Sequence, residues 1–235
     1  MKELIFTTEI SGMTDIDSAR PKPAREFIPQ WYKNLPADIP ERSVNKNFFI
    51  SKLKTNFKTA KTCPSFPAVF NEGYVLRAPC DIHLGFVNNN FFMDASNSDI
   101  WLELHDHDQM TNHIPNRPVR GIFKITTRWQ CIAPKGYSVR YVPLFWTFNQ
   151  DWTASYGIIE HDKMHQLNVQ ILYTSDKDEI LIKQGTPLVQ LIPFKREEYK
   201  YKITEMTEKL QRKINVARLS VLGRYKAGYL KHDIK

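Results

Sequence analysis

The stretch Gly157-Ile-Ile-Glu-His-Asp-Lys-Met-His-Gln-Leu-Asn-Val-Gln-Ile-Leu-Tyr173 indicates the fold class of the chain. Its second half alternates apolar with polar residues, which is the period-two pattern of a half-buried strand. The alternating apolar residues are Leu167, Val169 and Ile171. A polar turn leads from there to a second predicted strand over 179–183, and Gly185-Thr-Pro187 leads to a third over 188–194. Three strands with two turns between them predict a compact antiparallel unit.

The rest of the chain predicts further strands with an arm at each end, so the expected fold class is mainly β. Residues 1–62 are polar and contain prolines, which predicts an extended N-terminal arm with a short helix near 27–35. Residues 63–196 hold the predicted strands. Beyond them, apolar residues recur every three or four positions and predict a long amphipathic α-helix within 197–235. These apolar positions are Tyr199, Ile203, Met206, Leu210, Ile214, Ala217 and Val221.

Charge is distributed unevenly along the chain. The net charge is +8, and residues 195–235 alone hold twelve Lys and Arg against five Asp and Glu. Such a basic segment suits nucleic acid or an acidic partner surface, or it simply faces water. No apolar run approaches the roughly 20 residues of a membrane span. The first residues also lack the features of a signal peptide. We therefore expect a soluble protein inside the cell, with no membrane partner.

Histidines supply the densest cluster of candidate metal ligands. His105, His107 and His113 lie in one polar stretch, and two imidazoles with a carboxylate form a set that binds iron or zinc. Stretches of this composition are more often simply solvated, so we expect no metal and name these three residues as ligands if there is one. The cysteines are three in number and far apart, which predicts free thiols.

Two neighbouring aromatic residues stand out in the predicted N-terminal arm. Trp31 and Tyr32 follow Pro29, a residue that suits the first turn of a short helix. Large aromatic side chains outside a predicted core are typical of docking anchors. We therefore expect both residues to bind a surface.

Four short motifs between Gly73 and Arg196 stand in the order and spacing of a known superfamily. They are Gly73-Tyr-Val-Leu76; Pro134, Gly136, Arg140 and Pro143; Gly157-Ile-Ile-Glu-His-Asp-Lys163; and Gly185-Thr-Pro-Leu-Val-Gln-Leu191. Together they resemble the motifs of the trimeric dUTPase and dCTP deaminase superfamily, over about half of the chain. The resemblance implies a dUTPase-like β-clip fold, which is an antiparallel β barrel, and a homotrimer.

Most residues that the superfamily uses for catalysis are replaced in this chain. Val75 occupies the position of an Asp in the superfamily, and Leu144-Phe145 the position of the Arg-Ser pair that grips phosphates. Glu160 replaces the Asp that activates water, Lys163 replaces a Tyr, and Pro187 replaces an Arg. The glycine-rich C-terminal motif is absent. Without the phosphate clamp, the groups that stabilise charge in pyrophosphate cleavage are missing. The resemblance therefore implies the fold without the reaction.

The chain also resembles, over most of its length, a family met mostly in tailed-phage genomes. The pieces that carry this resemblance are Ile28-Pro-Gln-Trp-Tyr-Lys-Asn-Leu-Pro36, Cys63-Pro-Ser-Phe66, Pro134-Lys-Gly-Tyr-Ser138 and Gly185-Thr-Pro-Leu-Val-Gln-Leu-Ile-Pro-Phe-Lys-Arg-Glu197. This resemblance implies a phage protein, found in the virion or in the cytoplasm of the host bacterium, and brings no activity with it.

Three functions fit the sequence. The first is assembly without catalysis, as a homotrimer in or on a phage particle, with other phage structural proteins as partners. The second is a nucleotide-processing hydrolase or deaminase relative with a site rebuilt around Glu160, helped by Asp162 and Gln190. The third is a regulator that binds nucleotide or nucleic acid, the latter through the basic C-terminal segment. No cofactor is expected. The residues expected to contact ligands or partners are Trp31, Tyr32, Arg140 and Lys163.

Overall fold

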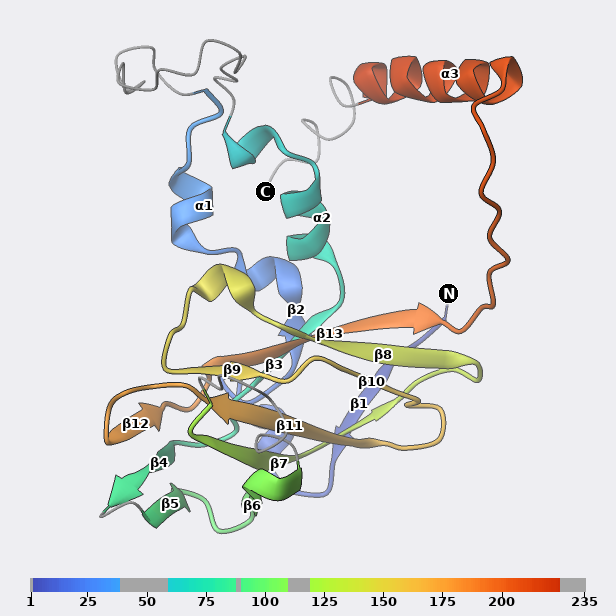
Figure 1. Ribbon diagram of the computed structural model, residues 1–235. Coiled ribbons are helices and arrows are strands. Elements are labelled where there is room, and N and C mark those ends of the chain that lie inside the picture. The colour runs from blue at the N-terminus through green and yellow to red at the C-terminus, as the bar shows by residue number, and fades with distance from the viewer. Residues whose placement is uncertain (1, 39–58, 88–89, 110–118, 225–235) are drawn as a thin grey trace, which may run out of the picture. The chain divides into compact units, whose positions relative to one another are not determined.

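The computed structural model describes residues 2–38, 59–87, 90–109 and 119–224, with the backbone alone at 107 and 217–224. The chain forms two compact units, Met1–Arg196 and Glu197–Lys235. The first unit consists mainly of antiparallel strands with a few short helices, so the predicted mainly β fold class is confirmed (Figure 1).

The first sheet is built around one long strand, β7 (Gly121–Ile132). This strand pairs antiparallel with β1 (Ile5–Thr8), β6 (Trp101–His105) and β11 (Gln166–Tyr173), and β11 pairs in turn with β9 (Trp152–Ala154). Aromatic and β-branched residues alternate with polar ones along both central strands, a pattern that suits a pleated sheet with one buried face.

Two further sheets complete the first unit. The second sheet has the order β10 (Gly157–Ile159), β8 (Tyr137–Pro143), β13 (Pro187–Lys195), β3 (Tyr74–Arg77) and β2 (Lys22–Pro23). The third sheet has the order β12 (Glu179–Ile182), β4 (Ile82–Val87) and β5 (Asn90–Ala95). All pairs of neighbouring strands in these sheets are antiparallel.

The three strands from residue 166 to residue 195 all exist, but the prediction that they form one antiparallel unit is wrong. β11, β12 and β13 lie in three different sheets. The segments between them let the chain pass from one sheet to the next. The segment between β11 and β12 is held by Arg120, whose guanidinium donates hydrogen bonds to the carbonyls of Ser175 and Lys177 at 3.0 and 3.1 Å.

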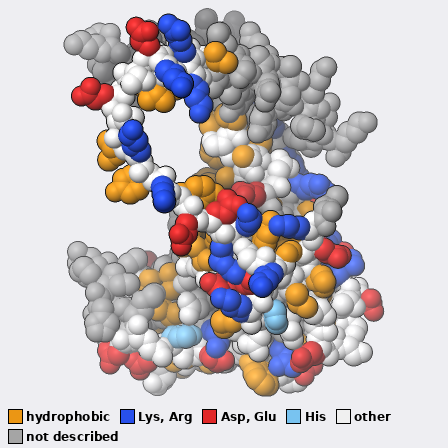
Figure 2. All heavy atoms as spheres, turned by 90° about the vertical axis from the view of Figure 1, so that its right-hand side faces the viewer, with side chains coloured by type: hydrophobic (Ala, Val, Ile, Leu, Met, Phe, Trp, Pro, Cys, Tyr) orange, Lys and Arg blue, Asp and Glu red, His pale blue; other side chains and the backbone are white. Residues whose placement is uncertain are grey.

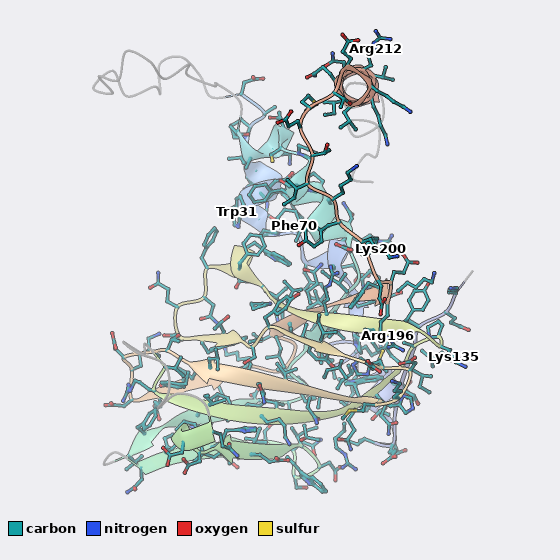
Figure 3. The ribbon with its side chains drawn as sticks, turned by 45° about the vertical axis from the view of Figure 1, so that its right-hand side comes forward. Trp31, Phe70, Lys135, Arg196, Lys200 and Arg212 are labelled. Atoms are coloured by element: carbon teal, nitrogen blue, oxygen red, sulfur yellow. The ribbon has the colours of Figure 1, made fainter. Side chains whose placement is uncertain are left out.

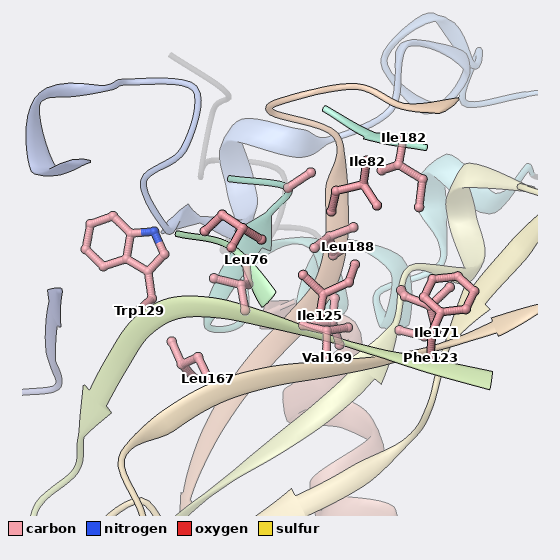
Figure 4. Packing of buried hydrophobic residues seen from close by; sticks show 14 of the residues in the cluster. Leu76, Ile82, Phe123, Ile125, Trp129, Leu167, Val169, Ile171, Ile182 and Leu188 are labelled. Carbon is pink, nitrogen blue, oxygen red and sulfur yellow. The ribbon is translucent and has the colours of Figure 1, made fainter. Parts of the chain in front are cut away.

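The main core lies between the sheets. Alternate residues of β7 and β11 point into it and meet side chains from the second and third sheets (Figure 4). Its fully buried members include Leu76, Ile82, Phe123, Ile125, Leu167, Ile171 and Leu188. Burial of this apolar surface is the main source of stability for such a domain.

A smaller core lies on the other face of the second sheet. Its buried members are Ala24, Tyr32, Phe70, Val75, Leu144 and Trp146. Val75 and Leu76 are neighbours on β3 and point to opposite faces, so this one strand serves both cores. The short helices around and outside this cluster are η1 (Met13–Asp15), η2 (Ala24–Phe27), α1 (Gln30–Asn34), η4 (Ala60–Thr62), α2 (Ser65–Asn71), η5 (His107–Gln109) and η7 (Phe145–Thr147).

The described part of the predicted N-terminal arm lies on the chain's own sheets. β1 pairs with β7, and β2 pairs with β3. The short helix expected near 27–35 corresponds to α1 (Gln30–Asn34). These residues belong to the same compact unit as the strands, so the chain's own sheets supply the surface on which the described part of the arm lies. A short strand expected at 48–50 lies outside the described residues.

The second unit contains α3 (Glu208–Arg224). The helix predicted to start near Tyr199 starts later, because residues 197–207 adopt no helical structure. Thr207 marks the start, since its hydroxyl accepts a hydrogen bond from the amide of Leu210 at 3.3 Å. The preceding residues Tyr199 and Ile203 are of aromatic and β-branched types, which favour helices weakly. Within the described part of the chain, no helix combines the length and the apolar character that crossing a membrane requires.

Among the glycines between residues 12 and 185, Gly73 should be the one whose replacement by alanine is most harmful. Its φ is +68°, and an added Cβ would lie 2.1 Å from the carbonyl oxygen of Leu191. We expect Gly73→Ala to lower the free energy of unfolding by more than about 2 kcal/mol. Gly12→Ala is the matched control, since Gly12 also has a positive φ of +75° but no atom within 4 Å of the added Cβ. Urea denaturation of both variants checks this, and equal losses would contradict it.

Candidate functional site

The candidate catalytic acids lie in a turn, residues 160–165, that joins β10 to β11. The backbone of this turn is tied to the end of β7. The amide of Ala133 donates to the carbonyl of His161 at 3.1 Å, and the amide of Cys131 donates to the carbonyl of His165 at 2.7 Å. Both ends of the turn are therefore held by main-chain hydrogen bonds, which fixes the side chains that it carries.

Asp162 is held in place by Arg196, the last residue of the first unit. The guanidinium donates to both carboxylate oxygens, at 2.9 and 2.5 Å, and the amide of Gly136 donates to Oδ2 at 2.8 Å. The Asp162 side chain is only 7% exposed. Its pKa is lowered, chiefly by the hydrogen bonds from Arg196. This carboxylate therefore stays ionised and joins the loop before β8 to the end of β13.

Glu160 is more exposed than Asp162 and is also ion-paired. Its carboxylate contacts the ammonium group of Lys163, and Nη1 of Arg196 lies 3.8 Å away. The pKa of Glu160 is lowered, first by the hydrogen bond from Lys163. The predicted base and the predicted binding residue Lys163 therefore neutralise each other. Figure 2 shows acidic and basic side chains intermixed on one face of the molecule.

His161 points inward from the same turn and is fully buried. Its Nε2 lies 2.8 Å from the hydroxyl of Tyr141, which is also buried. Its Nδ1 has no hydrogen-bond partner. Burial lowers the pKa of His161 to about 4 and raises that of Tyr141. The imidazole is therefore neutral at pH 7 and serves as a packed core residue.

The remaining candidate on β13, Gln190, links the sheet to α2. Its side-chain amide donates to the carbonyls of Val69 and Glu72 at 2.8 and 2.5 Å, and the residue is fully buried. Arg140 lies on β8, exposed, with its guanidinium 4.3 Å from the centre of the Phe194 ring. Gln190 therefore connects β13 to the end of α2, and Arg140 lies on the surface.

A cavity of about 310 Å³ lies where β8 ends and β13 begins. We call it the Phe145 pocket. Ten residues line it: Leu144, Phe145, Thr147, Asn149, Trp152, Thr153, Ala154, Thr186, Pro187 and Leu188. They include Leu144 and Phe145, which stand where the superfamily that the sequence resembles has its phosphate-gripping Arg-Ser pair, and Pro187, which stands where it has an Arg. None of the ten side chains is charged. The sequence alone does not indicate that these ten residues form a pocket.

The acidic turn and the Phe145 pocket lie at opposite ends of β8. Ile159, next to Glu160, pairs with Val139 near the start of β8, whereas Leu144 follows its last residue. At about 3.4 Å per residue, the five steps from Val139 to Leu144 span roughly 17 Å. Within one chain, therefore, neither Glu160 nor Asp162 can act on a molecule bound in the pocket.

The two predicted anchors lie near the pocket. Tyr32 is buried in the smaller core, where its ring packs 4.7 Å from that of Phe70. Trp31 lies on α1, in the same part of the domain as Phe70 (Figure 3). It is 36% exposed, and its indole N–H donates to the carbonyl of Trp146 at 3.0 Å. The nearest surface for both rings is thus the chain's own domain. Only Trp31 has an appreciable part of its ring in contact with solvent.

The predicted histidine cluster is only partly described. His105 ends β6, and its Nδ1 lies 2.9 Å from the side-chain oxygen of Gln109. His107 begins η5, and His113 lies outside the described residues. In the described part of the chain, no three His, Cys, Asp or Glu side chains come together as a metal site would require.

Comparison with known proteins finds no matching family model and no matching curated protein. Among solved structures, the chain is similar to a mutant dUTPase of Staphylococcus bacteriophage 80alpha, at 12% identity and a TM-score of 0.40, over 88% of this chain and 91% of that chain. For a dUTPase from phage phi11 of S. aureus the identity is 12% and the TM-score 0.37, over 88% and 98%. For the EIAV dUTPase the identity is 14% and the TM-score 0.33, over 59% of this chain and 87% of that chain. Identities this low leave the chemistry of the chain to its own residues.

The two carboxylates of the acidic turn should differ in their effect on stability. We expect Asp162→Asn to lower the urea midpoint clearly, because it leaves the Arg196 guanidinium and the Gly136 amide without their ionised acceptor. We expect Glu160→Gln to change the midpoint little, because an exposed ion pair contributes little. Equal effects of the two substitutions would show that the burial of Asp162 is not what matters.

Stability should fall as the pH falls from about 6.5 to 4. In this window the unfolded chain binds a proton at His161, whose ordinary pKa is 6.5, while the folded chain does not until about pH 4. Stability is therefore fully present above pH 6.5, and the loss amounts to roughly 3 kcal/mol at most. Denaturation at a series of pH values checks this. His161→Gln should flatten the dependence over this window; an unchanged slope would assign it to another group.

Proposed function

We propose that the protein works by assembly: its copies bind one another and other phage structural proteins, and the chain catalyses no reaction. The observation that supports this best is how the candidate catalytic residues are used. Arg196 holds Asp162, and Lys163 holds Glu160. A general base must exchange a proton near neutral pH. Ion pairs that lower the pKa values of both carboxylates work against that role.

The Phe145 pocket also argues against phosphate chemistry. Cleavage of a pyrophosphate needs cationic or strongly dipolar groups where charge develops, and bound phosphates are held by charge-assisted hydrogen bonds. None of the ten lining side chains is charged. An anionic substrate would lose its hydration there and gain no ion pair in return.

Exposed aromatic residues near this pocket support protein contact. Trp31, Phe145 and Phe148 are 36%, 54% and 69% exposed. Surfaces with several exposed aromatic residues are typical of interaction sites. The partners in this proposal are further copies of the chain, three to an assembly as the sequence resemblance implies, and other proteins of a phage particle.

A second candidate function follows from the basic end of the chain. Residues 197–235 hold ten Lys and Arg and five Asp and Glu, a net charge of +5. Such a segment suits nucleic acid, and its binding would weaken steeply with salt because phosphate contacts release counterions. Binding to single- and double-stranded DNA at two salt concentrations tests this, and equal binding at both would exclude it.

The test of the assembly proposal is the composition of phage particles. Mass spectrometry of density-purified particles should find this chain in a fixed ratio to the major capsid protein. Particles that lack the chain, from cells that express it strongly, would contradict the proposal.

A nucleotide panel tests the enzyme alternative separately. We expect neither the wild-type protein nor Glu160→Gln to hydrolyse or deaminate any nucleotide of the panel above the buffer rate. Turnover by the wild type that disappears in Glu160→Gln, with the urea midpoint unchanged, would instead establish a rebuilt site around Glu160.

A further inference from the structure

Phe148 has an unusual backbone conformation for its residue type. Its φ and ψ are 51° and 30°, the left-handed region, and its side chain is 69% exposed. Gly and Asn adopt this conformation at lower cost than Phe. The domain on its own would therefore be at least as stable with one of them at position 148. An exposed aromatic ring held in a strained turn suggests that the ring serves a contact outside the domain.

The ring of Phe148 stands on a rigid support. Its centre lies 5.8 Å from that of the Trp31 ring. Trp31 is fixed by its hydrogen bond to the carbonyl of Trp146, whose own side chain is buried in the smaller core. A ring held in this way loses little freedom when it binds, which favours association.

The Phe145 pocket lies directly beside this ring. Thr147 and Asn149, the neighbours of Phe148 in sequence, both line the pocket, whereas Phe148 does not. A projecting aromatic side chain and a recess thus occur side by side on one surface. The volume of about 310 Å³ is at the lower limit of ligand pockets and suits a single side chain.

We propose that Phe148 of one copy inserts into the Phe145 pocket of a second copy, and that the second copy does the same in return about a two-fold axis. This inference rests on the proposed self-association and names its surface. Because the ring and the recess are neighbours on one face, a two-fold pair forms the same contact twice, once in each direction.

Charge does not oppose a second copy at this face. Each chain has a net charge of +8, so two copies repel each other wherever basic surfaces meet. The ten residues of the pocket and the rings of Trp31 and Phe148 bear no charge. Contact through this face brings no like charges together and removes aromatic surface from water.

A two-fold contact predicts an even number of copies. It gives a dimer when it acts alone, and six copies when it joins two threefold assemblies. Removing the contact should therefore halve the mass of the assembly. This distinguishes the Phe148 contact from the threefold contact that the sequence resemblance implies.

The first experiment compares Phe148→Asn with Tyr156→Asn by sedimentation velocity of the full chain. Tyr156 is similarly exposed, at 61%, and lies outside helices and strands. We expect Phe148→Asn to halve the mass, with affinity weakened at least about tenfold. At a dilution where both proteins are single copies, its melting temperature should equal or exceed that of the wild type. Tyr156→Asn should leave the mass unchanged.

The second experiment restores the contact by mixing two variants. Thr153→Lys places a cation in the pocket and should abolish association in the same way. Phe148→Asn keeps the pocket and Thr153→Lys keeps the projecting ring, so a mixed pair retains one of the two contacts. Native mass spectrometry of the mixture should therefore find pairs of one copy of each. Misfolded variants would not complement each other in this way.

The outcomes separate this inference from the function on which it rests. A wild-type protein that stays a single copy at every concentration overturns both the self-association and this contact. A wild-type assembly whose mass is unchanged in Phe148→Asn and in Thr153→Lys overturns this contact alone. Loss of association in both variants without complementation in the mixture also overturns the two-fold exchange.

Discussion

The pairing of β7 with three other strands is the constraint on which the first unit depends. Ile125 lies opposite Val169 and Phe123 opposite Ile171, so one apolar row faces the second sheet. A slip of one residue would turn this row to the other face. Near Arg128, which has a φ of 63°, the register with β11 shifts. Beyond this irregularity β7 continues and pairs with β1, which ties the N-terminal segment to the sheet.

Strands could be predicted from the sequence where one face is buried, and their partners could not. The alternation in 167–171 reflects a core on one side and solvent on the other, so these residues alone predict a strand. Whether β12 pairs with β11 or with β4 depends on apolar faces that lie far apart in sequence. The start of α3 differs from the predicted start for a related reason. Tyr199 and Ile203 fit a helical spacing of four, but the helix begins after Thr207, whose hydroxyl caps it. The cap and the weak helix propensity of the preceding residues therefore decide the start, and the apolar spacing does not.

The candidate site was predictable as a set of residues but not as an arrangement. The motifs led to Glu160, Asp162 and Gln190. Glu160 pairs with Lys163 of its own motif, but the partners of the other two come from elsewhere: Arg196 after β13 and the backbone of α2. The Phe145 pocket combines residues from two motifs, which spacing alone could not bring together. The exposure of Phe148 could not be predicted, because an aromatic residue next to Phe145 and Trp146 is expected to be buried in the core. Only its backbone conformation and its exposure set it apart.

The charged groups of the acidic turn lie apart from the uncharged Phe145 pocket, and this separation decides what the two surfaces can do. The ion pairs of the acidic turn lie at one end of β8, where each carboxylate already has a cation. The other end presents uncharged side chains around a pocket. A hydrolase needs charge and substrate in one place, whereas an interface needs desolvated apolar contact bordered by satisfied polar groups. Bringing Glu160 to such a pocket would require a second copy of the chain. Its ion pair with Lys163 would then have to open first, so the arrangement within one chain favours binding over reaction.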